Sequence, residues 1–154
     1  MDAFREHLVK SLKGGQAFID YKSGLDGVKS ELRGVRPNKT LHSAYEELEH
    51  MRRAQEDLLD FALDPNWKPT EWPTGFWPEP GHKPTEEEWK KSLDGFFKGQ
   101  RRALKLAKDE GIDLLSKVPQ TENTYLRELM IIIEHNAYHY GKILDIRKAL
   151  GDWR

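Results

Sequence analysis

Apolar residues recur every three or four positions along most of the chain, and the alternation typical of strands is almost absent. This spacing predicts amphipathic helices. The pattern gives four substantial helices, over residues 2–13, 43–63, 85–110 and about 124–150, and a weaker helical stretch across 18–32. We therefore expect one all-α domain over residues 1–154, built as a four-helix bundle.

Capping signals mark the ends of the three longest predicted helices. Two pairs have the spacing of a capping box, in which a hydroxyl and a carboxylate each accept from the other's backbone N–H. A polar residue precedes the last helix, and a glycine stands where a helix-ending glycine is expected. These residues are Ser43 with Glu46, Thr85 with Glu88, Asn123 or Thr124, and Gly151.

The first two helical segments are less regular. Asp2 is placed to cap the first one, which carries Phe4, Leu8 and Leu12 along a single stripe. Gly24 and Gly27 interrupt the 18–32 stretch, and glycine inside a helix is unfavourable. We expect this second segment to form the weakest helix of the fold.

Residues 64–84 form a proline- and tryptophan-rich connection between the second and third long helices. Six of the eight prolines and three of the five tryptophans fall here. Disordered proline-rich linkers are usually poor in aromatic residues, so we expect an ordered loop packed on helical surface. It is either a wall over a pocket or a plug over an open end of the bundle.

Composition excludes several kinds of protein. The net charge is −1, with basic clusters interleaved with acidic ones, which disfavours a nucleic-acid-binding surface. There are no cysteines, so disulfides and thiolate chemistry by the chain itself are excluded, and a reducing cytoplasm is the expected location. We expect neither a secretory signal nor a membrane span, because no long apolar run is present.

The most apolar segment, residues 126–151, carries His135 and His139. On a helix these residues lie only about 40° apart and one turn along, so both imidazoles can reach one ion. The predicted face also holds Glu128, Ile131, Ile132, Tyr138, Ile143 and Ile146. A pair of histidines at this spacing on a core-facing side predicts a metal site, the alternative being two hydrogen-bonded core histidines.

A third ligand has to come from another helix. His50 is the best candidate, because it lies mid-helix on the flank of the apolar face. His42 stands at the start of that helix, and His82 lies in the proline-rich loop, where exposure is expected. His7 and Glu46 remain outside possibilities. Asn136 stands where the zinc proteases of the His-Glu-x-x-His type need glutamate, so that class is excluded.

The segments EHNAYHYGKILDIRKALG and HSAYEELEHMRRAQEDLLDF resemble the DinB-like (DinB/YfiT) superfamily, especially its DinB_2 type. WPTGFWP resembles the family's aromatic, proline-rich loop, and LREL the start of its last helix. The resemblance covers most of residues 40–153, and residues 1–39 match loosely. Such proteins are four-helix bundles, commonly homodimers, that hold a divalent metal with one histidine of the second bundle helix and two of the last. Carried over, these are His50, His135 and His139.

The resemblance implies a metal-dependent hydrolase or a thiol-dependent transferase or isomerase acting with bacillithiol, mycothiol or glutathione. Three imidazoles suit zinc, nickel, iron or manganese, and leave room for water or a thiolate. The alternatives are a non-catalytic metal-binding stress or interaction protein, and a bundle with structural histidines. No residue stands out as a general base. Glu128 lies two turns before His135, and Glu134 points about 100° away from it. We expect Tyr138 to be a core tyrosine.

Overall fold

The computed structural model describes residues 1–153, and this part of the chain is all-α, as predicted. The helices are α1 (Ala3–Lys13), α2 (Tyr21–Leu25), α3 (Ala44–Leu63), α4 (Glu86–Lys108) and α5 (Tyr125–Ala149), with a 3₁₀ turn, η1, at Ser30–Leu32. Within residues 1–153 there is no strand, only one isolated antiparallel bridge between Lys117 and Thr124. No helix in that range is both long and apolar enough to cross a membrane.

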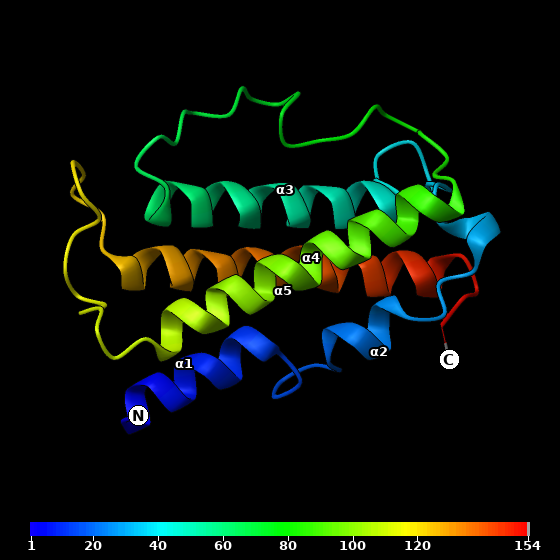
Figure 1. Ribbon diagram of the computed structural model, residues 1–154. Helices are drawn as coiled ribbons and strands as arrows, with labels where there is room; N and C mark the ends of the chain where they lie inside the picture. Colours follow the sequence, from blue (N-terminus) through cyan, green and yellow to red (C-terminus); the bar gives the residue numbers. More distant parts are fainter. Residues whose placement is uncertain (154) are drawn as a thin grey trace.

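The four longer helices lie along one another (Figure 1). α3 packs on both α4 and α5, and α1 packs on α4 and α5. Between α3 and α4 the chain returns along the length of α3, so these two helices run in the same direction, whereas α5 runs opposite to both (Figure 1). The antiparallel contact of α3 with α5 places the middle of one helix against the middle of the other.

Local capping accounts for most helix boundaries. Both predicted capping boxes are present at the starts of α3 and α4. Thr124 caps α5 by accepting from the backbone N–H of Arg127, which decides between the two predicted caps. Gly151, with φ of 71°, follows the last helix. α4 ends at Lys108, two residues before the end of its predicted range at 110.

The weaker N-terminal segment differs from its prediction. The 18–32 stretch is divided into α2 and η1, and Gly27 between them has φ of 75°, a conformation that interrupts a right-handed helix. Gly24 is needed for packing, since a Cβ there would lie 1.8 Å from the hydroxyl of Tyr140. Phe4, predicted on the core stripe of α1, is half exposed.

Two apolar clusters fill the interior. One joins α2 to the first half of α3, the start of α4 and the end of α5, and includes Leu48, Phe96 and Ile143. The other joins α1 to the opposite ends of α3, α4 and α5, and includes Leu59 and Leu129. Along α3 and α5 the break between the clusters falls near residues 52–57 and 134–139. Buried polar side chains gather in and beside this break.

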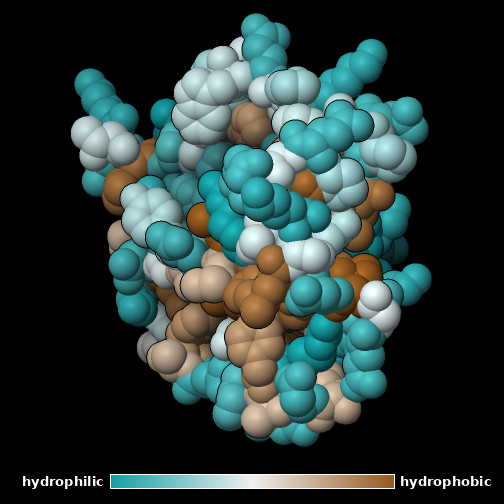
Figure 2. All heavy atoms as spheres, turned by 90° about the vertical axis from the view of Figure 1, so that its left-hand side faces the viewer, coloured by the Kyte–Doolittle hydropathy of each residue, from teal (hydrophilic) through white to brown (hydrophobic). Residues whose placement is uncertain are grey.

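The end of the molecule where α3 finishes and α5 begins is shown in Figure 2. Polar side chains cover most of this face, and apolar ones reach the surface between them (Figure 2). The segments that build this end carry the exposed residues Leu63 and Leu115. The buried histidines described below lie away from this face, in the middle of the helices.

The loop 64–84 is held along α3 by a stripe of side chains spaced four, three and four residues apart. Glu46 accepts from the backbone N–H of Gly81, His50 bonds the carbonyl of Phe76, and Arg53 donates to the carbonyl of Trp77. One turn further, Asp57 accepts from Trp67 and Thr70. The stripe of four residues is Glu46, His50, Arg53 and Asp57. The loop is therefore a wall along α3, and does not cover an open end of the packed helices.

Candidate metal centre

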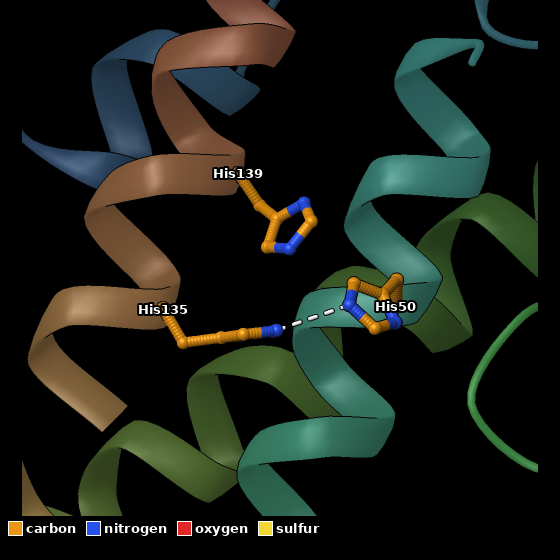
Figure 3. A group of neighbouring side chains, drawn as sticks. All are labelled: His50, His135 and His139. Carbon is orange, nitrogen blue, oxygen red and sulfur yellow. Dashed lines mark hydrogen bonds between the residues drawn. The ribbon is translucent and has the colours of Figure 1, made fainter. Parts of the chain in front are cut away.

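His50, His135 and His139 come together between α3 and α5. In Figure 3 the two α5 imidazoles project toward His50 on α3. One nitrogen of each residue lies within 4.8 Å of the others, and the Nε2 atoms of His50 and His135 are 3.0 Å apart. His50 and His139 are buried, and His135 is half-buried. The structure thus unites the three residues that helical spacing selected.

The nitrogens fit a divalent ion in both spacing and chemistry. Two nitrogens bound to one tetrahedral zinc ion lie about 3.3 Å apart, because each Zn–N bond is about 2.0–2.1 Å. The His50–His135 separation is close to that value, and the other separations within the group are at most 4.8 Å. An all-imidazole donor set suits zinc, nickel, iron or manganese.

Glu47 holds His139 in the orientation that metal binding needs. Its Oε2 atom accepts from Nδ1 of His139 at 2.5 Å, and its Oε1 atom accepts from Nδ1 of His42 at 3.0 Å. Because Nδ1 of His139 carries the donated proton, its Nε2 atom keeps a lone pair. A carboxylate on the remote nitrogen of a metal-binding histidine fixes the ring and makes it more basic.

The loop performs the same task for His50. Its Nδ1 atom donates to the carbonyl of Phe76 at 3.1 Å, which leaves Nε2 unprotonated toward the other histidines. The ring of Trp77 stacks on His50 with centroids 3.9 Å apart and planes 5° from parallel. Trp77 also lies against His42, at 4.1 Å. The loop therefore fixes both the ring plane of His50, through Trp77, and its tautomer, through the Phe76 carbonyl.

His135 is the least constrained of the three. Its Nδ1 atom is buried and has no hydrogen-bond partner. Since His50 presents a lone pair at Nε2, the 3.0 Å contact requires Nε2 of His135 to be the donor. If Nε2 of His135 serves as a ligand, the proton has to lie on Nδ1, for which the described structure supplies no acceptor.

Burial keeps two of the three imidazoles neutral. It lowers the pKa of His50 to about 4, with partial opposition from the bond to Phe76, and lowers the pKa of His135 to about 3. Neutral imidazole is the form that binds metals. Burial alone would raise the pKa of Glu47, but its hydrogen bonds with His139 and His42 outweigh this and lower it. At neutral pH the His50 and His135 imidazoles are therefore neutral, beside one buried carboxylate.

The other candidate ligands lie outside the group. His7 is exposed on α1, and His82 contacts Glu88. Glu46 is buried, but its carboxylate receives Arg36 and the N–H of Gly81. The acidic residue at the site is the next one along, Glu47.

None of the three residues considered for acid–base chemistry, Glu128, Glu134 and Tyr138, is placed to act as a base at the histidines. Glu128 is buried and accepts from Arg127, while one of its carboxylate oxygens has no partner. Glu134 is exposed, as its angle from His135 predicted. Tyr138 is 61% exposed, so the reading as a core tyrosine is wrong, although its ring packs edge-on against His139.

Sequence reasoning missed two parts of the site. Glu47 lies three residues before His50, on the same side of α3, and this Glu-x-x-His spacing was a usable signal. The carbonyl of Phe76 and the ring of Trp77 carried no comparable signal, because the path of the loop decides which backbone atom faces His50.

A buried bridge of two side-chain amides fixes the position of α5 along α3 next to the histidines. Asn136 donates to the side-chain carbonyl of Gln55 at 2.9 Å, and Gln55 donates to the carbonyl of Phe96 on α4 at 2.9 Å. Asn136 stands where a zinc protease would have its glutamate. Here it has a structural role instead, as part of this bridge. The bridge fixes three helices at the level of the site.

Comparison with protein-family models, with curated proteins and with solved structures gives no match. The functional argument therefore depends on the site itself. Three buried imidazoles, two of them with their Nδ1 atoms bonded to acceptors, form a group suited to hold one metal ion.

Proposed function

We propose that the chain is a DinB-like four-helix bundle that binds one divalent metal ion through His50, His135 and His139. The observation that carries the proposal is the convergence of three imidazole nitrogens within 4.8 Å. The bonds of His139 to Glu47 and of His50 to Phe76 support it, because both orient Nε2 toward the centre.

The reaction proposed is metal-dependent hydrolysis or thiol-dependent transfer, with a small molecule or a low-molecular-weight thiol as substrate. A metal with three protein ligands lowers the pKa of a bound water or accepts a thiolate. The chain's own residues hold and orient the ligands: Glu47 fixes His139, and the Phe76–Trp77 wall fixes His50 and excludes water from one side. The family resemblance also supports a cytoplasmic homodimer.

A non-catalytic metal-binding stress or interaction protein is the second candidate. It is favoured by the commitment of both Glu47 oxygens to histidines, which leaves neither free as a base. Cavities of about 330 Å³ between α3 and α4 and about 510 Å³ beneath the loop are lined by side chains other than the three histidines.

The metal claim is tested by metal analysis after reloading and desalting. We expect one equivalent in the wild type, little in the alanine variants of His50, His135 and His139, and full occupancy in His82→Ala. Wild-type occupancy no higher than in these three variants would overturn the site.

Cobalt loading separates the two functions. Titration with glutathione should produce a sulfur-to-cobalt charge-transfer band if a thiolate enters the coordination sphere. Loss of bound metal without a band, or no response at all, contradicts the thiol-dependent reaction. Turnover of activated esters that depends on His135 then supports the hydrolase, and its absence supports the binding protein. Light scattering at about 18.0 kDa alone would reject the dimer.

A further inference from the structure

His50 belongs to two structures at once. Its Nε2 atom faces His135 in the metal group, and its Nδ1 atom bonds the loop at Phe76. It is the only member of the stripe Glu46, His50, Arg53 and Asp57 that also belongs to the histidine group. His50 is therefore the ring through which the histidine group is hydrogen-bonded to the loop, alongside ring contacts of Trp77 with His42 and His139.

The two nitrogens of that ring are linked by one proton. A neutral imidazole carries its proton on Nδ1 or on Nε2, and a metal takes the nitrogen that lacks it. A metal at Nε2 of His50 thus selects the tautomer with Nδ1–H. The Phe76 carbonyl is only an acceptor, so this is also the tautomer that the docked loop requires. In the other tautomer two lone pairs would face each other at 3.1 Å.

We propose that metal binding and docking of the Phe76–Gly81 segment onto α3 form one coupled equilibrium, with His50 as the shared residue. This inference rests on the proposed metal site. Metal occupancy strengthens docking of the segment, and docking raises metal affinity by the same factor, because coupling between two binding events is reciprocal.

The surroundings of His50 support the coupling. Trp77 covers its ring face, and the next backbone carbonyl along the loop, that of Trp77, accepts from Arg53 at 2.9 Å. Gly81 is bonded to Glu46 at 3.0 Å. Along α3 the segment is thus attached on both sides of His50, at Arg53 and at Glu46, and release of the segment would have to break these contacts together with the His50 bond. The first part of the loop is attached separately, through Asp57.

Arg53 and Arg52 provide a matched pair of variants. Both donate to the carboxylate of Glu49, but only Arg53 also donates to the loop. Arg53→Gln should release the segment and lower zinc affinity about tenfold, the lower end for groups that support a metal ligand. Arg52→Gln should change it less than twofold. Equal affinities in the two variants would overturn the coupling.

Hydrogen exchange with and without zinc gives the second measurement. In the wild type, zinc should slow exchange about tenfold across residues 75–82 and leave residues 64–70 much less affected. His135→Ala, which keeps the bond of His50 to Phe76 but lacks a ligand, should show no such response. If zinc binds and slows both loop parts equally, or neither, the coupling is wrong while the metal site stands. If the wild type binds no zinc, it is the proposed function that fails.

Discussion

Glu47 and His139 are joined by a hydrogen bond of 2.5 Å between Oε2 and Nδ1, buried between α3 and α5. Both side chains are almost fully screened from solvent. The carboxylate lies one helical turn before His50, so α3 carries both one histidine of the group and the carboxylate that orients His139 on α5. Replacing Glu47 should therefore change the metal affinity while the three histidines themselves stay in place.

Glu47→Gln should weaken zinc binding by about 10–100-fold while all three histidines remain. The amide keeps the size of the side chain but loses the charge that makes His139 a stronger ligand. Competition against a chelator of known affinity measures the change. Glu56→Gln, an exposed position on the same helix, is the control and should match the wild type. Equal affinities for wild type and Glu47→Gln would show that the carboxylate does not act on the site.

The metal-free protein should lose stability as the pH falls from 7 toward 4. Unfolded histidine protonates near pH 6.5, whereas burial holds the pKa of His50 at about 4 and that of His135 at about 3. The unfolded chain therefore binds more protons across this interval, and the stabilisation present above pH 6.5 decreases as pH falls. Urea unfolding of wild type and His135→Gln should show a steeper pH dependence in the wild type. Parallel curves would contradict the lowered pKa of His135.

Metal occupancy should extend to lower pH than for ordinary histidines. Protons compete with the metal for Nε2, and they do so only weakly when the pKa of the free ligand is low. Because burial lowers the pKa of His50 to about 4 and that of His135 to about 3, we expect these two residues to keep zinc bound below pH 6.5. Dialysis at stepped pH followed by metal analysis checks this. Half-release at pH 6.5 would mean that the histidines behave as exposed ones.

The helices and the His135–His139 pair were accessible to sequence reasoning because each depends on local spacing, whereas His50 was selected by its position in the middle of another helix and by the family resemblance. Ser43 with Glu46 and Thr85 with Glu88 mark helix starts, and the i, i+4 spacing of His135 and His139 needs only helical geometry. The division of residues 18–32 was not accessible, since Gly27 adopts a positive φ and Gly24 makes room for Tyr140, a tertiary contact. The support of His50 by Phe76 depends on a backbone carbonyl, which any residue type would supply.

The Asn136–Gln55 bridge should contribute to stability as a pair. Asn136→Ala leaves the side-chain carbonyl of Gln55 buried without its donor, which costs about 1–3 kcal/mol of unfolding free energy. The double replacement of both residues by leucine should cost less than the two single leucine replacements added together, because neither then leaves a polar partner behind. Denaturant unfolding of the metal-free wild type, the two single leucine variants and the double variant gives the double-mutant cycle. Strict additivity would show that the bridge carries no coupling energy.

Glu46 should matter for the fold and not for the metal, although it adjoins Glu47. Its carboxylate caps α3 through the N–H of Ser43, pairs with Arg36 and receives the loop N–H of Gly81. Burial alone would raise the pKa of Glu46, but these contacts together lower it to about 2, so the group is ionised at neutral pH.

Glu46→Gln should therefore lower the unfolding free energy by about 1–3 kcal/mol, because a neutral amide cannot satisfy both Arg36 and two backbone donors. Since the carboxylate does not touch the histidines, zinc affinity should fall much less than in Glu47→Gln, and only through the loop contact at Gly81. The measurement is urea unfolding at pH 7 together with chelator competition on the same samples. A variant that unfolds like the wild type but binds zinc as weakly as Glu47→Gln would reverse the roles assigned to these neighbouring carboxylates.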